Sequence, residues 1–407
     1  MNILWVSPFL PKPDAPHTGG RALAQWIRWT AERHEVTLVC RIEPAERAEA
    51  EAWRPRLAGL QLQEFRRPVG ALATARIAAS YVHLGRAANR LLRSGGFDLL
   101  HVEYLETGLG IDAALPVPKV AVAIDELAKP ARHRLHLARG PRARLGAWLY
   151  WRAIGRVQRR ICRKFDRILT MSENDRLALL ATDPRLSVGV LPLPMGIDPL
   201  RTGAVRREDA GLLFVGAMHR DANVDAVTHF CREILPRVRA EVPAVTFTIA
   251  GGEPSNEVSR LAAQPGVRVT GFVESLEPHY GAATVFVAPL RITGGIAGKT
   301  IDALAAGCPV VTTTLGNDGL GAAPGVHLLV ADEPAEFAAA VVRLLRDPAL
   351  RRRLGAAAAR FAAERYGPAV SAAALEREHV ALAGGLALTR RSGGGPRSST
   401  PRTRDRG

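Results

Sequence analysis

The sequence predicts an α/β protein with two domains, each built on a parallel β-sheet, that face one another across a central cleft. Its 407 residues exceed the roughly 100 to 200 residues of a typical single domain. Short β-rich runs alternate with helix-length segments, which is typical of parallel strands joined by helical crossovers. The second half of the chain repeats this alternation more regularly than the first, which indicates a second domain of the same class.

In the first half, the elements follow a strand–helix order. We expect a helix over residues 21–33 and strands at residues 2–7, 36–40, 99–102, 120–124 and 167–172. Prolines concentrate between residues 188 and 199, and a polar stretch follows. We therefore predict an N-terminal domain over residues 1–195 and a linker over 196–210.

In the second half, a domain over residues 211–365 is predicted. Its expected strands are 212–215, 245–250, 267–270, 284–289, 310–313 and 326–330, and its expected helices are 223–241, 255–263, 276–281, 299–306, 333–346 and 348–365. A further helix follows over 366–388. Residues 389–407 are rich in Gly, Ser, Pro and Arg and have nothing to bury, so we predict a disordered basic tail.

The net charge of +16 is concentrated in two segments. Residues 129–167 hold thirteen basic side chains against one acid, and the tail from Arg390 onward holds six arginines against one acid, so the rest of the chain is close to neutral. A strongly basic protein suggests nucleic acid, a membrane surface or a phosphorylated ligand. No helix-turn-helix, zinc-ligand spacing or aromatic–basic RNA motif is present, so we expect no nucleic-acid partner.

Cysteine usage and hydropathy bear on the compartment. The four cysteines, Cys40, Cys162, Cys231 and Cys308, form no C-x-x-C pair, so we expect buried thiols, no disulfide framework and no metal site. No uncharged apolar run reaches the roughly 20 residues that span a bilayer. The N-terminus lacks the basic start of a signal peptide. We expect a cytoplasmic protein that is soluble or peripheral at the inner face of the membrane.

A glycine-rich loop over residues 293–298 carries the clearest chemical signal. It follows the end of a predicted buried strand and opens a helix, so its backbone N–H groups favour an anion. Arg291 and Lys299 bracket the loop, and both are expected to contact a diphosphate and stabilise it as a leaving group. Asp302 lies three residues after Lys299, where an intrahelical ion pair and a ligand-binding carboxylate are both open.

The first half has its own glycine pair. The Gly-x-Gly-x-x-Gly motif of dinucleotide-binding proteins is absent after the first strand. A proline-rich loop ends instead in His17, Thr18, Gly19 and Gly20 at the start of a helix. The two glycines would let a ligand approach the backbone. A flexible turn that merely starts the helix is the alternative.

The run GGIAGKTIDALAAGCPVVTT, residues 294–313, resembles the donor-binding segment of family 4 glycosyltransferases. Other segments resemble that family in the same order, and the resemblance covers about residues 1–385. These segments are SPFLPKPDAPHTGGR and HEVTLVC near the N-terminus, HVEYL at 101–105, residues 166–176, 211–226, 247–254 and 267–290.

The resemblance implies a GT-B architecture, with two Rossmann-like domains facing a cleft and a C-terminal helix that crosses back to the N-terminal domain. It implies that the C-terminal domain binds a nucleotide-diphosphate sugar and the N-terminal domain an acceptor, which would be a glycan, a lipid-linked sugar or a small molecule. It also implies a mostly retaining reaction in polysaccharide biosynthesis, with no metal and no cofactor besides the co-substrate.

Individual residues follow from the same resemblance. Asp302 stands where an acidic residue hydrogen-bonds the nucleotide ribose, and Arg291 and Lys299 would be the catalytic phosphate contacts. The implied donor-binding residues are Gly19, Gly20, Gly216, Arg220, Gly294, Gly295, Ile296, Lys299 and Asp302, and the implied acceptor-side residues are His17, Glu103, Asp125 and Glu126. For Asp125 and Glu126, solvated carboxylates at a strand end are the alternative.

Departures from the family pattern keep other functions open. Two glutamates eight positions apart are replaced by Gly294 and Asp302, as in a subgroup related to exopolysaccharide enzymes, and Ile124 stands where many relatives have a histidine. The alternatives are a GT-B binding or scaffold protein without turnover, and a nucleotide-sugar epimerase or hydrolase on the same fold.

The basic segment 129–167 has a helical pattern of its own. Residues 141–165 place Tyr150, Ile154, Val157, Ile161 and Phe165 on one stripe and arginines on another, with Trp148 and Trp151 nearby. A basic amphipathic helix with interfacial aromatic residues suits an anionic membrane surface. The alternative is an ordinary outer helix whose apolar stripe is core.

Overall fold

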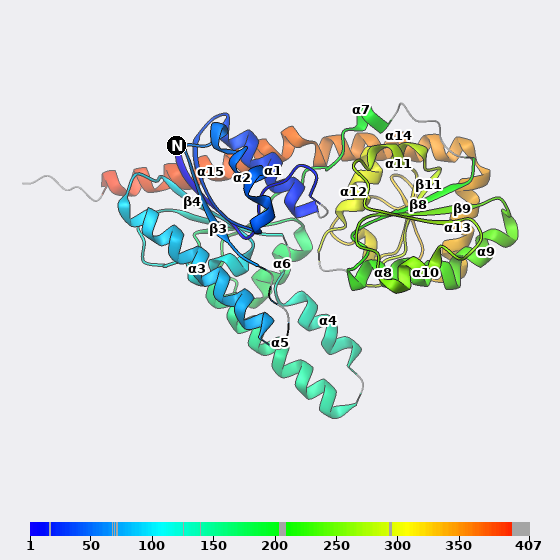
Figure 1. Cartoon of the computed structure of the whole chain (residues 1–407), viewed down its shortest axis with the longest axis horizontal. Helices are drawn as coiled ribbons and strands as arrows, with labels where there is room; N and C mark the ends of the chain where they lie inside the picture. The colour runs from blue at the N-terminus through cyan, green and yellow to red at the C-terminus, as the bar shows by residue number, and fades with distance from the viewer. Residues whose placement is uncertain are drawn as a thin grey trace, which may run out of the picture.

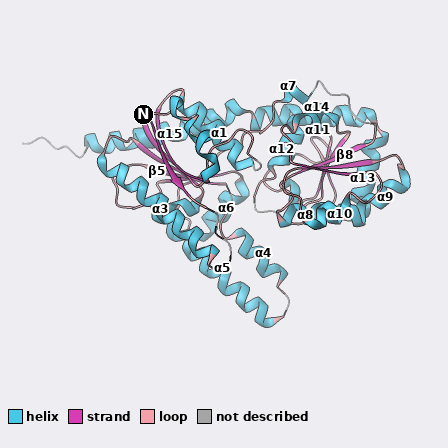
Figure 2. Ribbon diagram, viewed as in Figure 1, coloured by secondary structure: helices cyan, strands magenta, loops and turns pink. Residues whose placement is uncertain are grey.

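The computed structural model describes residues 1–392 except 16–17, 67, 69, 71, 125, 139, 203–208 and 293–294. Its described part forms two α/β lobes side by side, and two consecutive helices, α14 (Pro348–Tyr366) and α15 (Pro368–Ser392), run along the C-terminal and the N-terminal lobe respectively (Figure 1). Helices cover both faces of each sheet (Figure 2). Because both faces are covered, the inner strands are apolar on both sides, which explains their short, continuous hydrophobic runs.

The N-terminal sheet has seven parallel strands in the order β3-β2-β1-β4-β5-β6-β7. They are β1 (Asn2–Ser7), β2 (Glu35–Ile42), β3 (Gly59–Glu64), β4 (Leu99–Glu103), β5 (Lys119–Ala123), β6 (Arg167–Thr170) and β7 (Val188–Val190). The sequence analysis missed the two edge strands. β3 is half-polar and only partly buried, and β7 has three residues within a proline-rich stretch.

The helices of this lobe are α1 (Thr18–Ala31), α2 (Arg47–Glu51), α3 (Ala73–Ser94), α4 (Lys129–Leu137), α5 (Pro141–Cys162) and α6 (Glu173–Thr182). Ser172 caps α6, since its Oγ accepts a hydrogen bond from the backbone N–H of Asp175. Helices α4 and α5 lie against one another and project from the lobe as a two-helix extension (Figure 1). We call residues 129–162 the arm.

The C-terminal sheet has six parallel strands in the order β10-β9-β8-β11-β12-β13. They are β8 (Gly211–Val215), β9 (Thr246–Ala250), β10 (Val267–Gly271), β11 (Val285–Ala288), β12 (Val310–Thr312) and β13 (Leu329–Val330). In both lobes the strand order reverses beside the first strand. Open α/β sheets bind ligands at such a point, outside the carboxyl ends of the strands.

Around this sheet lie α8 (Asp221–His229), α9 (Leu235–Glu241), α10 (Asn256–Leu261), α11 (Glu277–Ala282), α12 (Gly298–Ala305), α13 (Pro334–Arg346) and α14 (Pro348–Tyr366). A π-helical turn, Phe230–Ile234, joins α8 to α9, so the predicted helix 223–241 is one continuous element. Phe230 packs on Phe247 with ring centroids 4.6 Å apart, and both are fully buried at the centre of the domain core.

The linker contains the short helix α7 (Pro199–Thr202), and α15 (Pro368–Ser392) returns to the N-terminal lobe. There the indole Nε1 of Trp26 donates to Ser371 Oγ at 2.8 Å, and that hydroxyl donates to the Pro192 carbonyl. The Arg167 guanidinium makes two hydrogen bonds to the Glu378 carboxylate. The helix includes residues 389–392, which the sequence analysis assigned to the tail; residues 393–407 lie outside the described part.

Candidate active site

A cavity of about 500 Å³ lies between the two lobes. Its walls come from the loop after β1 and the start of α1, from the linker, and from the loops that follow β8, β9, β10 and β11. A cavity of this size at the carboxyl ends of parallel strands is large enough for a nucleotide-sized ligand.

Lys299 is the central cation of the C-terminal wall. Its Nζ donates a hydrogen bond to Asn223 Oδ1 and lies 4.2 Å from the centroid of the Phe214 ring. Burial lowers the pKa of Lys299 to about 7, with a further contribution from the positive charge of Arg220. Among the described residues no acidic side chain pairs with this amine, so an anionic ligand would supply its missing counter-charge.

The backbone around Lys299 is packed so closely that two positions, Gly216 and Gly251, have no room for a Cβ atom. A Cβ on Gly216 would lie 2.5 Å from Asn223 Nδ2 and 3.0 Å from Lys299 Nζ, so only glycine leaves room for this pair. Gly251, at φ +145°, lies so close to the Gly216 carbonyl that a Cβ there would overlap it. The Tyr280 hydroxyl donates to the Lys299 carbonyl and fixes the first turn of α12.

Two helix N-termini meet beside Lys299. Arg220 is the N-cap residue of α8, and Ala297 is the N-cap residue of α12. Both residues line the cavity, together with Gly295 and Ile296 of the glycine-rich loop. Two cationic side chains beside two helix N-termini form an anion site suited to a diphosphate.

Asp302 is placed differently from its expected ribose-binding role. Its side chain is 1% exposed; Oδ2 accepts from Arg21 of the N-terminal lobe at 2.9 Å, and Oδ1 accepts from the Gly196 backbone N–H at 2.7 Å. Burial raises the pKa of Asp302, although Arg21 and the Gly196 N–H oppose that effect. In this arrangement Asp302 ties α12 to α1 and the linker, and it does not line the cavity.

The predicted glycine pair at the start of α1 faces the core. Gly19 and Gly20 are buried, and a Cβ on Gly19 would lie 2.3 Å from the Tyr104 hydroxyl. Thr18 and Arg21 line the cavity in their place. The glycine at position 19 is therefore explained by packing against Tyr104, not by direct approach of a ligand.

Arg291 also lies away from the cavity. Its guanidinium makes two hydrogen bonds to the Asp225 carboxylate on the outer side of α8, and half of the side chain is exposed. The two residues line a separate surface hollow. Of the two predicted catalytic cations, only Lys299 lines the cavity.

The structure places the predicted acceptor-side residues in different surroundings. Glu103 is fully buried, with Oε1 2.9 Å from His101 Nε2, so the structure contradicts its placement at an acceptor site. Glu126 is 3% exposed and pairs with Arg132 at the base of the arm, and burial raises its pKa. It is therefore not a solvated carboxylate either. His17, Asp125 and Gly294 lie outside the described residues.

Several residues that line the cavity were not predicted from the sequence, among them Arg21, Asn223 and Phe272. Arg21 directly follows the glycine pair, Asn223 lies seven residues after Gly216, and Phe272, which follows β10, is 66% exposed. The sequence could have indicated Arg21, because this cation directly follows the glycine pair that was predicted to bind an anion. Nothing in the local sequence marks Asn223 or Phe272, because their role depends on the packing of separate loops.

Two searches of the described residues gave negative results. No group of three or more His, Cys, Asp or Glu side chains in these residues has an arrangement that would hold a metal ion. No helix in the same part of the chain is both long and apolar enough to cross a membrane. All four cysteines are buried, as predicted.

Comparison with protein families gives two matches. Residues 18–194 match the glycosyl transferase 4-like domain, and residues 209–347 match the model described as glycosyl transferases group 1. The two matches divide the chain at the same place as the two lobes and together span most of it.

Two curated proteins are similar over part of their length. An uncharacterized 44.6 kDa protein in the cps region of Klebsiella pneumoniae is 24% identical over 166 residues, which are 39% of this chain and 43% of that protein. A D-inositol 3-phosphate glycosyltransferase of Frankia alni is 32% identical over 178 residues, which are 40% of this chain and 44% of that enzyme. The chain thus aligns with less than half the length of each relative.

Solved structures share the fold over nearly the whole chain. Sucrose-phosphate synthase from Thermosynechococcus elongatus has a TM-score of 0.69 at 15% identity, covering 97% of this chain and 100% of that one. Anabaena HepE, solved in complex with UDP and glucose, has a TM-score of 0.64 at 13% identity, covering 92% and 98%. The predicted architecture of two facing Rossmann-like domains is confirmed. The chain belongs to the group 1, or family 4, glycosyltransferases of GT-B fold.

Proposed function

We propose that this protein is a glycosyltransferase that moves a sugar from a nucleotide-diphosphate sugar to an acceptor hydroxyl on a glycan, a lipid-linked sugar or a small molecule. The observation that carries the proposal is that two cations, Lys299 and Arg220, lie at the N-termini of α12 and α8 and both line the cavity between the two lobes. Lys299 has no acidic partner among the described residues, so a diphosphate would complete its site.

The cavity suggests how the donor lies. The diphosphate would contact Lys299, Arg220 and the backbone of Gly295 and Ile296. The exposed ring of Phe272 offers a face on which a nucleotide base can stack. HepE, whose fold this chain shares, was solved with UDP and with glucose, which supports a nucleotide-sugar as the donor class.

The proposed reaction is retaining and independent of metal. The bond between the anomeric carbon and the phosphate oxygen breaks, the acceptor oxygen bonds to that carbon, and the acceptor proton passes to the leaving phosphate. Lys299 and Arg220 would neutralise the charge that develops on the leaving diphosphate, which is the charge stabilisation a divalent cation supplies in other transferases. The wall formed by Thr18 and Arg21 would face the acceptor.

We further propose a peripheral location at the inner face of a membrane, where a lipid-linked acceptor would be presented. The N-terminal lobe, which would carry the acceptor side, also carries the basic arm (Figure 1). This part of the proposal is independent of donor binding.

Purified protein incubated with radiolabelled UDP-, GDP- and dTDP-sugars tests the proposal. One donor should be consumed by slow hydrolysis, or by transfer when glycan or lipid-linked acceptors are added, and Lys299→Ala should abolish turnover. Arg346→Ala serves as the matched control, since it removes an exposed cation that pairs with Glu241 on the C-terminal domain. Binding of a nucleotide-sugar without any turnover would favour the scaffold alternative. Isomerisation of the sugar while it stays on the nucleotide would favour the epimerase alternative.

A further inference from the structure

The arm is unusual because much of its apolar surface is not packed. Leu145, Trp148, Leu149, Tyr150 and Val157 of α5 are between 43% and 58% exposed. A Cβ added at Gly146 or Gly155 would meet no atom of the described residues within 4 Å, so none of these residues covers those sides of the helix. An ordinary outer helix buries its apolar stripe, and this part of α5 does not.

The last turns of α5 behave differently. Ile161 and Cys162 are buried in the core of the N-terminal lobe, and Phe165 just beyond the helix is buried with them. Gln158 is also buried, and its Oε1 accepts a hydrogen bond from the backbone N–H of Ala128, which fixes α5 to the start of α4. The helix is therefore held firmly at its base, while residues 141–157 stand away from the lobe (Figure 1).

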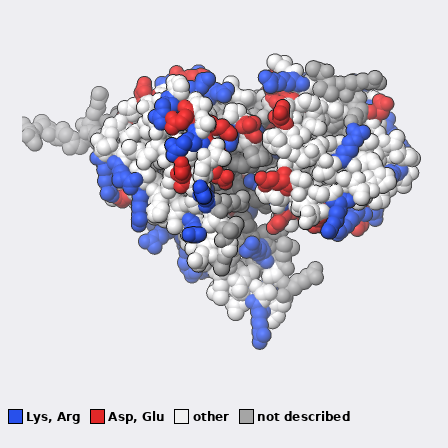
Figure 3. Space-filling model, viewed as in Figure 1, with Lys and Arg blue, Asp and Glu red and all other residues white. Residues whose placement is uncertain are grey.

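The exposed apolar side chains lie among arginines. Residues 129–165 contain no acidic residue, whereas α5 alone carries Arg142, Arg144, Arg152, Arg156, Arg159 and Arg160. In Figure 3 the visible face of the arm shows basic atoms and no acidic atoms, whereas both lobes carry acidic atoms. The Arg152 guanidinium lies 5.6 Å from the Trp148 ring centroid, which keeps a cation next to an exposed aromatic side chain.

Four arginines at the root of the arm line a shallow hollow: Arg156, Arg159, Arg160 and Arg163. Arg163 pairs with Asp183, at 2.7 Å between Nε and Oδ2. The other three have no acidic partner among the described residues, and Arg159 Nε is buried without a hydrogen-bond acceptor in this part of the chain. A hollow lined by guanidinium groups fits a phosphate, which accepts paired hydrogen bonds from arginine.

We propose that the arm is a membrane-docking element. Leu145, Trp148 and Leu149 enter the interface of an anionic bilayer, and the arginine hollow binds phosphate groups of its lipids. Charge complementarity selects this occupant, because an anionic leaflet attracts a segment free of acids, and tryptophan and tyrosine favour the headgroup region. The charge and aromatic side chains place the arm on the membrane rather than across it.

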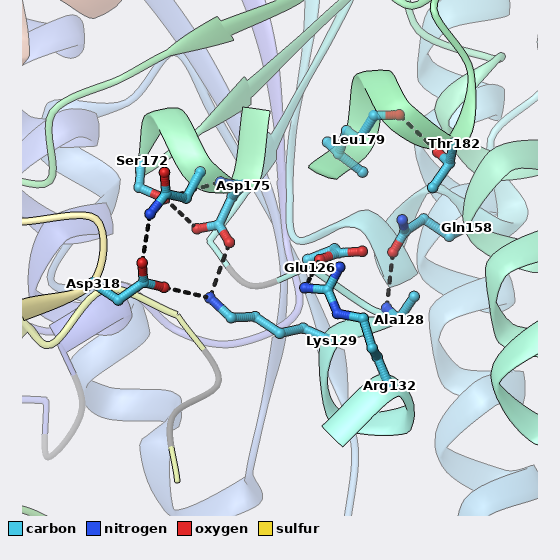
Figure 4. A network of polar contacts seen from close by, with 11 residues as sticks. Glu126, Ala128, Lys129, Arg132, Gln158, Ser172, Asp175, Leu179, Thr182 and Asp318 are labelled. Atoms are coloured by element: carbon cyan, nitrogen blue, oxygen red, sulfur yellow. Dashed lines mark hydrogen bonds and ion pairs between the residues drawn. The ribbon is translucent and has the colours of Figure 1, made fainter. Parts of the chain in front are cut away.

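The base of the arm explains how docking would serve the cleft. Lys129, the first residue of α4, lies 3.1 Å from Asp175 of the N-terminal lobe and 3.8 Å from Asp318 of the C-terminal lobe (Figure 4). The root of the arm is therefore at the boundary between the lobes. A membrane bound by the arm would therefore lie next to this boundary, where the acceptor of the proposed function, on which this step rests, could be lipid-linked.

Flotation of the full-length protein with phosphatidylglycerol-containing vesicles and with pure phosphatidylcholine vesicles tests this proposal without any sugar donor. Wild type should float with the anionic vesicles only. The variant Arg152→Gln/Arg156→Gln/Arg160→Gln should lose about 100-fold in partition coefficient, because each basic residue near an anionic surface contributes roughly a factor of five. All three side chains are exposed, so their replacement leaves the core intact.

The matched control is Arg352→Gln/Arg353→Gln/Arg360→Gln, which makes the same charge change on exposed positions of α14 and should float like wild type. A second variant, Trp148→Ser/Leu149→Ser, should reduce binding without changing charge, and it should also weaken the blue shift of tryptophan fluorescence on vesicle addition. Equal flotation of wild type and the arm variants would overturn the proposal. So would absence of vesicle binding together with tight binding of duplex DNA or RNA at physiological ionic strength.

Discussion

Lys299 illustrates how the fold sets the chemistry of a single side chain. The hydrogen bond to Asn223 and the ring of Phe214 hold the amine in a half-buried place, near Arg220 and without an acidic partner among the described residues. Burial lowers its pKa to about 7, so near neutral pH the empty site is only partly charged. A diphosphate bound there would raise the pKa again, and binding and protonation are therefore coupled.

The first prediction concerns this coupling. Below pH 7 Lys299 is already protonated, and donor affinity should be flat; above pH 7 binding must take up a proton, so affinity should fall by up to about tenfold per pH unit. Titration calorimetry of a nucleotide-sugar in buffers of different ionisation enthalpy measures the proton uptake directly. Lys299→Arg keeps its charge at all these pH values, so its affinity should not change between pH 7 and pH 9. If the donor affinity of Lys299→Arg fell with pH as steeply as that of wild type, a group other than Lys299 would be responsible for the titration.

At the residue scale, the sequence predicted Lys299, Gly216, Arg220, Gly295 and Ile296 as neighbours, and all of them line one cavity. Their positions follow from a strand end and a helix start, which local sequence marks well. Arg291 and Asp302 are near Lys299 in sequence but point elsewhere, because Asp225 and Arg21 hold them. Those partners lie 66 and 281 residues away, and local sequence does not reveal such pairs.

At the scale of elements, α15 is the clearest case of a helix whose role depends on distant partners. Its sequence shows only a helical pattern after Pro368. In the structure it packs on the N-terminal lobe through Ser371, Glu376 and Glu378, which contact Trp26, His34 and Arg167. Its side chains also reach the core, where His379 Nε2 lies 2.8 Å from His101 Nδ1. The resemblance to a known family supplied this return of the helix, whereas periodicity alone predicted only that it is helical.

The second prediction tests this attachment. Ser371→Ala removes the acceptor of the Trp26 indole N–H and the donor to the Pro192 carbonyl, so two buried groups lose their partners. Unfolding free energy should fall by about 2 to 3 kcal/mol. The control Ser94→Ala removes an exposed hydroxyl that only bonds the Leu91 carbonyl, and it should cost less than about 0.5 kcal/mol. Urea denaturation compares the two; equal midpoints would show that the buried serine does not anchor α15.

A second pair of elements, α1 and α12, meets across the cleft. A Cβ on Gly298 would lie 2.5 Å from both Oγ1 and Cγ2 of Thr18, so the start of α12 packs directly against the Thr18 side chain at the start of α1. The sequence analysis assigned Gly298 to a ligand loop. The structure adds that this glycine also lets the lobes approach each other.

For the whole molecule, polar side chains join the two lobes at their boundary. Arg21 pairs with Asp302 deep in the boundary, and Asn174 Nδ2 donates to Asp318 Oδ1 at its edge. Asp318 also lies beside Lys129 (Figure 4). The sequence predicted the two lobes and their order correctly, because hydrophobic runs and glycine turns mark each α/β unit. It did not predict these contacts, since each joins residues of separate domains.

The third prediction concerns the buried Arg21–Asp302 pair. Removing either partner leaves the other charge buried and unpaired, so Arg21→Ala and Asp302→Ala should each cost about 3 kcal/mol of stability. The double variant should cost clearly less than the sum of the two. Urea unfolding of the four proteins provides the cycle. Additive losses would mean that the pair does not couple the lobes.

The central claim is that the cavity binds a nucleoside diphosphate group through Lys299. Titration calorimetry of UDP, GDP and dTDP into wild type, Lys299→Ala and the control Arg346→Ala tests it most directly. We predict that one nucleotide binds wild type and the control alike, and that Lys299→Ala weakens binding at least about tenfold, the loss expected for a charged hydrogen bond to phosphate. Equal binding by Lys299→Ala and wild type, with both proteins folded, would contradict the assignment of this site.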